Sequence, residues 1–161
     1  MRVTVLGASG LLGKELTREW TGDAVTGLSS RDADIRDAKR VQQVVEKTRP
    51  DWIVLAAAYT DVDGCESNAE LAFAVNRDAP VIVAHAAKMF GARLVFLSSD
   101  YVFDGKKRTP YEIDEPRNPQ TVYGRTRPKR RSNSLTRCRT VALPEHPGCL
   151  APAGNAFQIR F

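Results

Sequence analysis

The chain has 161 residues, of which 42% are hydrophobic and 27% charged, proportions typical of a globular protein with room for one domain of ordinary size. Its apolar stretches fall well short of the roughly 20 residues of a membrane span, and the N-terminus turns glycine-rich after one short apolar run, unlike a secretory signal. We therefore expect a cytoplasmic protein with no membrane partner. Three widely spaced cysteines, Cys65, Cys138 and Cys149, argue against a disulfide framework or a metal site.

The net charge of +5 comes from one end of the chain. Residues 1–120 hold 16 Lys and Arg against 18 Asp and Glu, a balance of −2, whereas residues 121–161 hold 8 against 1, a balance of +7. Basic side chains at this end could attract phosphates, but they lack interleaved aromatic residues and any recognisable nucleic-acid-reading module. We therefore expect no nucleic-acid partner.

Predicted strands and helices alternate over the first hundred residues. Apolar patterning places strands at 2–6, 24–28, 52–58 and 94–97, and helices at 10–20, 37–47, 66–76 and 79–90, with a bend at Ala79-Pro80. This order predicts an α/β fold, a doubly wound parallel sheet with helices on both faces. The proline-bearing stretch 104–121 is expected to be a loop beside the ligand crevice, and beyond Tyr123 no further strand is predicted.

A glycine-rich turn connects the first predicted strand to the first predicted helix. Gly7 permits a tight turn, Gly10 lets the backbone approach a pyrophosphate, and Gly13 lets the helix pack closely on the sheet. Glycines alone are a weak signal, but the strand and helix around them make it stronger. The segment therefore predicts a dinucleotide-binding site, the alternative being a glycine-rich turn without a ligand.

The end of the second predicted strand bears on which dinucleotide is bound. An acidic residue here often holds the adenosine ribose, yet this chain has Leu28-Ser29-Ser30-Arg31. Because Arg31 can pair with a 2′-phosphate, the sequence favours NADP(H), with NAD(H) as the alternative. Asp34 and Ile35 follow and are candidates for the adenine edge, or else belong to a solvated turn before the helix.

Two hydroxyl groups and a cation suggest carbonyl chemistry. Ser99 follows the fourth predicted strand, and Arg127 comes four residues after Tyr123, on the same face of an expected helix. A tyrosine beside a cation can protonate a carbonyl oxygen while a hydride arrives from a nicotinamide, and a serine hydroxyl can polarise that carbonyl. Taken singly, Ser99 and Tyr123 would be ordinary turn residues.

Together these blocks resemble the extended short-chain dehydrogenase/reductases, and most closely the dTDP-4-dehydrorhamnose reductase family. The resemblance covers residues 1 to about 126. Its distinctive pieces are Gly7 to Gly13, Asp34 to Asp37, Arg49-Pro50-Asp51, Ala56 to Thr60, Val62-Asp63 with Glu66, Asn76, Ser98 to Gly105, and Tyr123 to Thr126. It implies a Rossmann-type sheet, truncated and without the family's C-terminal substrate domain, and an NAD(P)H-dependent reduction of a dTDP-4-keto-6-deoxy sugar in dTDP-rhamnose biosynthesis.

The resemblance also assigns roles to particular residues. The cofactor-binding set would be Gly7, Gly10, Leu11, Leu12, Gly13, Arg31, Asp34, Ile35, Ala57, Ala58, Tyr59 and Tyr123. Within it, Gly10, Leu11 and Leu12 would meet the pyrophosphate, and Ala57, Ala58 and Tyr59 the nicotinamide ribose. Ser99 and Tyr123 would be catalytic, and Asp100 would lie with Ser99 near the nucleotide-sugar substrate. The sequence leaves the oligomeric state open, with a homodimer as one alternative.

The sequence departs from the family's pattern directly after the tyrosine. The family has a lysine where this chain has Arg127, whose planar head does not replace an ammonium point charge between tyrosine and ribose. Pro128 lacks an N–H group and would clash inside a helix carrying Tyr123, at about 3 kcal/mol or more. The alternative function is a non-catalytic, dinucleotide-binding subunit like the family members that regulate methionine adenosyltransferase.

The sequence thus divides into residues 1–126, a dinucleotide-binding domain, and residues 127–161, a divergent basic tail. A fragment resembling the family returns at Pro152 to Phe157. One hypothesis is a reading-frame shift near Thr126, which resequencing would test. The other is a divergent, disordered tail.

Overall fold

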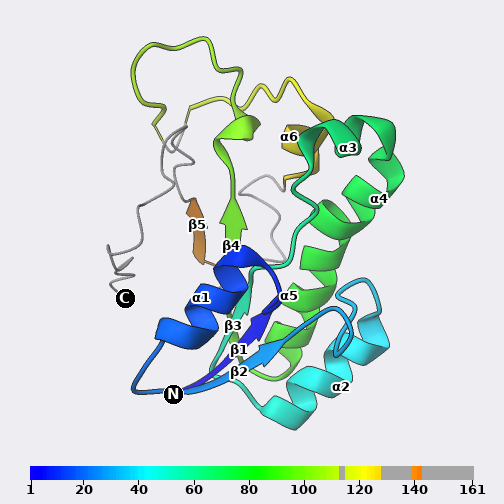
Figure 1. Ribbon diagram of the computed structural model, residues 1–161, viewed down its shortest axis with the longest axis vertical. Coiled ribbons are helices and arrows are strands. Elements are labelled where there is room, and N and C mark those ends of the chain that lie inside the picture. Colours follow the sequence, from blue (N-terminus) through cyan, green and yellow to red (C-terminus); the bar gives the residue numbers. More distant parts are fainter. Residues whose placement is uncertain (113–114, 128–138, 143–161) are drawn as a thin grey trace.

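The computed structural model describes residues 1–112, 115–127 and 139–142 (Figure 1). Their strands form one sheet in the order β2-β1-β3-β4-β5, and every neighbouring pair is parallel. The strands are β1 (Arg2–Leu6), β2 (Ala24–Leu28), β3 (Trp52–Leu55), β4 (Arg93–Ser98) and β5 (Arg139–Ala142). The predicted doubly wound α/β sheet is confirmed. Its strand order reverses at β1, and in such sheets ligands bind beyond the carboxyl ends of the strands at that point.

Helices connect the strands and continue beyond the carboxyl ends of β3 and β4. The α-helices are α1 (Leu11–Glu19), α2 (Ala38–Thr48), α3 (Val62–Ser67), α4 (Ala69–Phe73), α5 (Ala79–Met89) and α6 (Val122–Thr126). A π-helical turn, η1 (Ala74–Asp78), joins α4 to α5, and a 3₁₀ turn, η2 (Asp100–Val102), follows β4. In the described part of the chain, none of the helices has the length and apolar character to cross a bilayer.

The two faces of the sheet bury different side chains. Val3, Val5 and Val54 form one cluster, against which Leu16 and Trp20 of α1 pack. The opposite face contributes Leu6, Ile53, Leu55, Leu94 and Phe96, which pack with apolar residues of α2 and α5 such as Val41, Val45 and Val83. β1 and β3, in the middle of the sheet, therefore bury apolar side chains on both faces, which is why no alternating pattern marks them in the sequence.

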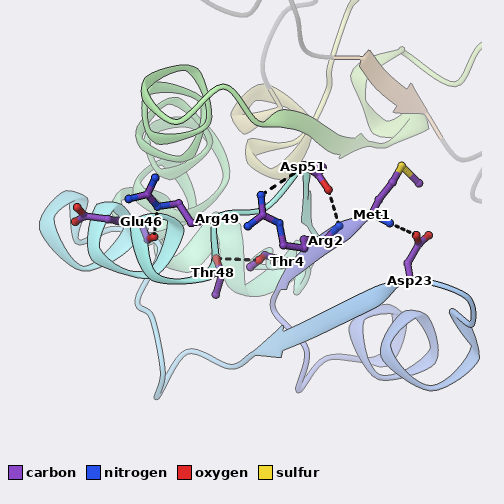
Figure 2. A network of polar contacts seen from close by, with 8 residues as sticks. All are labelled: Met1, Arg2, Thr4, Asp23, Glu46, Thr48, Arg49 and Asp51. Atoms are coloured by element: carbon purple, nitrogen blue, oxygen red, sulfur yellow. Dashed lines mark hydrogen bonds and ion pairs between the residues drawn. The ribbon is translucent and has the colours of Figure 1, made fainter.

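A network of polar contacts lies where β1 begins (Figure 2). The Met1 amine donates to the Asp23 carboxylate at 2.5 Å, and the backbone N–H of Arg2 donates to Asp51 Oδ2 at 2.7 Å. Further along β1, the buried Thr4 hydroxyl donates to Thr48 at the end of α2. These bonds join the amino end of β1 to the residues that precede β2 and β3.

Four elements differ from the sequence prediction. The helix predicted at 66–76 begins at Val62 and is divided at Asn68 into α3 and α4. β3 ends at Leu55 instead of residue 58, because the N–H groups of Ala56 and Ala57 both donate to the Leu6 carbonyl and so leave the ladder. At the expected bend the chain forms η1, where the Ala79 N–H donates to Ala74 O, five residues back. Past Tyr123 the structure has β5, which was not predicted. β5 has only four residues and pairs with β4 in parallel. Its sequence shows no apolar period.

Candidate functional site

The glycine turn lies beyond the carboxyl end of β1. Its three glycines differ in whether the surrounding atoms leave room for a side chain. Gly7 has a φ of +95°, and a Cβ there would be 2.5 Å from the Ala57 nitrogen. A Cβ on the buried Gly13 would overlap the Gly7 carbonyl oxygen, so α1 packs directly on the turn. At Gly10 the nearest atom to an added Cβ is 3.4 Å away, with ordinary φ. The protein's own packing explains Gly7 and Gly13, but not Gly10.

The start of α1 points open amides outward. Gly10 is the N-cap and makes no side-chain capping bond, so the first-turn N–H groups of Leu11, Leu12 and Gly13 have no partner within the helix. Leu11 is 81% exposed, although it is a large apolar residue. Open amides and the positive end of the helix dipole favour an anion such as a diphosphate.

The β2 end lies against the glycine turn, since Gly7 and Ala8 both donate their N–H groups to Leu28 O at 2.8 and 2.9 Å. Arg31 follows on the surface. Asp34 is held by the Arg36 guanidinium, whose hydrogen bonds keep the pKa of that carboxyl below its usual value. Ile35 is buried in the core cluster below the sheet.

The segment after β3 is fixed by Asn76, which lies in η1 and is 1% exposed. Its Oδ1 accepts from the Tyr59 N–H, and its Nδ2 donates to the Tyr59 carbonyl, both at 2.9 Å. The same Nδ2 donates to Thr126 Oγ1 at 3.2 Å. One amide thus links the Ala57–Tyr59 segment to α6. Asn76 belonged to the resemblance, but its cross-linking role was not predicted, because the π turn that aims it has no sequence signature we could use.

The β4 end brings Ser99 and Tyr123 to the same neighbour, Tyr101. The Ser99 hydroxyl donates to Asp100 Oδ1 at 3.1 Å and accepts from the Tyr101 N–H at 3.3 Å. The Tyr101 ring meets the Tyr123 ring edge-on, with centroids 5.4 Å apart. Gly124 lets this contact form, since a Cβ there would overlap the Tyr101 carbonyl oxygen. Tyr101 itself was not singled out from the sequence.

Tyr123 and Arg127 form a buried pair. Arg127 Nη2 donates to Tyr123 Oη at 2.6 Å, and the guanidinium lies 4.7 Å from the tyrosine ring centroid. Tyr123 is 2% exposed and Arg127 8%. The four-residue spacing predicted that Arg127 would lie in the same helix as Tyr123. In the structure Arg127 instead lies just after α6, in an extended conformation. This is the conformation favoured by a residue that precedes a proline, and Pro128 itself, for which a clash was predicted, lies outside the described residues.

Among the described residues, two buried polar atoms here have no hydrogen-bond partner: Ser98 Oγ and Arg127 Nε. Both are buried, and Phe96, on the same face of β4 as Ser98, lies 6.0 Å from the Arg127 guanidinium. Buried unpaired polar groups are costly and are most common at functional sites. Cys65 packs in the same cluster as Tyr123, where burial raises the pKa of its thiol, so it remains protonated.

The structure therefore gathers the predicted residues in three groups along the carboxyl edge of the sheet. The first is Gly7, Gly10, Leu11, Leu12 and Gly13 with Ala57; the second is Ala58, Tyr59, Ser99, Asp100, Tyr123 and Arg127; the third is Arg31, Asp34 and Ile35. Of the third group, Ile35 contributes to the core. The tail residues 128–138 and 143–161, including Cys138, Cys149, Lys129 and the Pro152–Phe157 fragment, lie outside the described residues.

The strand order and the glycine turn define a Rossmann-type fold of the short-chain dehydrogenase/reductase class. The chain belongs to the RmlD substrate binding domain family, whose profile matches residues 1–140. It is 46% identical over 128 residues to dTDP-4-dehydrorhamnose reductase of Streptomyces griseus, a match that covers 78% of this chain and 42% of the relative.

Solved structures agree with this assignment. The structure of dTDP-4-dehydrorhamnose reductase from Bacillus anthracis in complex with NADP is similar, with a TM-score of 0.82 and 31% identity over 89% of this chain and 53% of that one. UDP-glucose 4-epimerase from Thermus thermophilus, in complex with NAD, has a TM-score of 0.73 at 22% identity, with coverage of 79% and 47%, and shares the fold. The chain spans about half the length of the relatives it matches.

Proposed function

We propose that this chain is the coenzyme-binding and proton-donating part of an NAD(P)H-dependent reductase of dTDP-4-keto-6-deoxy sugars. The observation that carries the proposal is the buried Tyr123–Arg127 pair at the sheet edge that holds the glycine turn. Relatives named dTDP-4-dehydrorhamnose reductase, one of them solved with NADP, support the choice of reaction and coenzyme.

The residues at the glycine turn fit a dinucleotide. Gly10 has no packing reason within the protein to lack a side chain, and Leu11 is exposed beside it. A pyrophosphate lying on the amides of Leu11 and Leu12 would account for both features. Ala57 adjoins this turn and leads to Tyr59, so the nicotinamide half would extend towards the segment held by Asn76.

When bound, the coenzyme supplies the hydride. Tyr123 Oη holds the proton that the sugar's carbonyl oxygen receives. Arg127 donates to the same oxygen at 2.6 Å, so its positive charge stabilises the phenolate that remains. Because Arg127 occupies one lone pair of Oη, the phenolic proton is directed away from the guanidinium. Ser99 would polarise the carbonyl, with its hydroxyl released from Asp100.

Two measurements test the proposal. Calorimetric titration with NADPH and NADH should show binding to the purified chain, and a dTDP-4-keto-6-deoxyhexose with NADPH should then be reduced. A folded chain that binds neither coenzyme would contradict the proposal. Binding without turnover would favour the regulatory alternative.

A further inference from the structure

The short helix that carries Tyr123 depends on contacts at its two ends. α6 has five residues, and a helix of this length is not stable in isolation. At its carboxyl end the Thr126 hydroxyl donates to the Tyr123 carbonyl at 2.6 Å and accepts from Asn76. At its amino end Thr121 Oγ1 accepts from the Gly124 N–H at 3.1 Å. The position of the Tyr123 phenol therefore depends on the groups that hold these ends.

A carboxylate from a distant part of the chain completes the amino end of α6. Glu66 Oε1 accepts from the Val122 N–H at 2.7 Å, although the two residues are 56 positions apart in the sequence. Val122 is buried, and its N–H is one of the first-turn groups that have no partner within the helix. A hydrogen bond from a backbone N–H to a carboxylate is shorter and stronger than one between neutral groups. Glu66 therefore forms a firm tie between α3 and the start of α6.

The helix that carries Glu66 is itself held in place. α3 begins after the N-cap Asp61, whose Oδ1 accepts from the Gly64 N–H at 2.9 Å. Cys65, next to Glu66, is fully buried and packs in one cluster with Tyr123. α3 and α6 lie side by side (Figure 1), in contact through this apolar cluster and through the Glu66 hydrogen bond. A change at Glu66 is therefore transmitted to α6 directly.

We propose that Glu66 is a positioning residue for the reduction: its carboxylate fixes the amino end of α6, so that the Tyr123 hydroxyl stays against Arg127 and the Tyr123 ring against Tyr101. Glu66 is one of the residues that carry the resemblance, which assigned it no role. Because proton transfer requires a donor within hydrogen-bond reach of the carbonyl, a small displacement of α6 lowers the rate steeply. This inference rests on the proposed function, since it concerns the proton donor of the same reaction.

The test compares four proteins: the unaltered chain, Glu66→Gln, Glu66→Ala and Glu70→Ala. The glutamine keeps an oxygen that can accept from the Val122 N–H, and the alanine does not. Glu70 lies exposed in the first turn of α4, so its removal matches the lost charge and leaves the hydrogen bonds of α6 in place.

Turnover of a dTDP-4-keto-6-deoxyhexose with NADPH is the first readout. Glu66→Ala should lower kcat by about tenfold to a hundredfold. Its Kd for NADPH should change by less than about twofold, because the glycine turn is untouched. Glu66→Gln should keep most of the turnover, and Glu70→Ala all of it.

A second readout follows Tyr123 without any turnover. The rings of Tyr101 and Tyr123 lie edge-on with centroids 5.4 Å apart, close enough for a nuclear Overhauser contact between them. The chain has four tyrosines, so with isotope-labelled tyrosine the signal of Tyr123 can be assigned by its loss in Tyr123→Phe. The contact between the rings should persist in Glu66→Gln and Glu70→Ala, and it should be weakened or lost in a folded Glu66→Ala chain.

The outcomes separate this inference from the proposed function. If Glu66→Ala keeps the ring contact and the kcat of the unaltered chain, the inference is overturned while the proposed function stands. The same holds if Glu66→Gln is as damaging as Glu66→Ala, or if Glu66→Ala weakens NADPH binding as much as turnover. If the unaltered chain binds no coenzyme or reduces no keto sugar, the proposed function is lost, and the ring contact alone decides whether Glu66 positions Tyr123. If Glu66→Ala does not fold, Glu66→Asp takes its place, since it keeps the charge and withdraws the carboxylate by one methylene group.

Discussion

The amino and carboxyl ends of the parallel strands, which form two opposite edges of the sheet, differ in how their polar groups are paired. At the amino edge, Met1, Arg2 and Thr4 each find a partner on the segments before β2 and β3 or on α2 (Figure 2). At the carboxyl edge, the first amides of α1 are uncapped, and Ser98 Oγ and Arg127 Nε are buried with no partner in the described part of the chain. The amino edge therefore has these polar groups paired within the protein, whereas the carboxyl edge has polar groups to which a ligand can bond.

The largest effect is expected from Tyr123→Phe, at the carboxyl edge. It removes the proton donor and should reduce turnover by about 10² to 10⁴-fold. Coenzyme binding should persist, because the glycine turn is untouched. The Arg127 Nη2 donor loses its partner, so unfolding in urea should reveal a loss of about 1–3 kcal/mol. Turnover equal to that of the unaltered chain would remove Tyr123 from the mechanism.

Within the glycine turn, the comparison can be made between two neighbouring alanine variants. Gly13→Ala should destabilise the fold by about 3 kcal/mol, since the new methyl group overlaps the Gly7 carbonyl oxygen. Gly10→Ala has room for its methyl group and should fold almost normally, yet bind NADPH more weakly. Urea unfolding and calorimetry measure the two effects. Equal stability of the two variants would contradict the different roles assigned to these glycines.

Asn76→Ala tests the cross-link between the β3 end and α6. It deletes the three hydrogen bonds of the buried Asn76 amide and leaves the Tyr59 backbone groups and the Thr126 hydroxyl with fewer partners. We expect a loss of about 2–3 kcal/mol in unfolding free energy. The matched control is Asn68→Ala, which removes an exposed capping bond of α4 and should cost only about 1 kcal/mol.

The smallest effect is expected at the amino edge, from Asp23→Asn. The Asp23 hydrogen bond raises the pKa of the Met1 amine above 8.0, so its contribution is full below that pH and fades as pH rises through the folded value. Hydrogen bonds from Met1 and Trp20 lower the pKa of Asp23 below 3.8, so its contribution is full above that pH and fades in acid. Melting temperatures across pH 3–10 should therefore show a plateau that the variant flattens. If the curve of the variant runs parallel to that of the unaltered chain, the Met1–Asp23 pair makes no measurable contribution to stability.

The sequence predicted the first half of the fold almost residue by residue. β1, α1, β2 and α2 match because glycines and an Asp cap mark their ends. β3 was predicted too long, since Ala56 and Ala57 are as apolar as a strand but donate outside the ladder. β5 was missed, because its four residues, Arg139 to Ala142, have no apolar pattern in the sequence. For the site, residue types predicted Ser99, Tyr123 and Arg127. The four-residue spacing predicted the cation beside the phenol, but with Arg127 in the helix, whereas the contact forms with Arg127 extended just after α6.

The π turn η1 has a consequence for the rod formed by α4, η1 and α5. A π turn contains about one residue more than an α turn, which shifts the phase of everything after it by roughly 100°. Asn76 can therefore face Tyr59 and Thr126 while Val83 and Ala87 face the sheet. A one-residue deletion within Ala74–Asp78 would bring the two halves back into step, and one of the two surfaces would then rotate out of place.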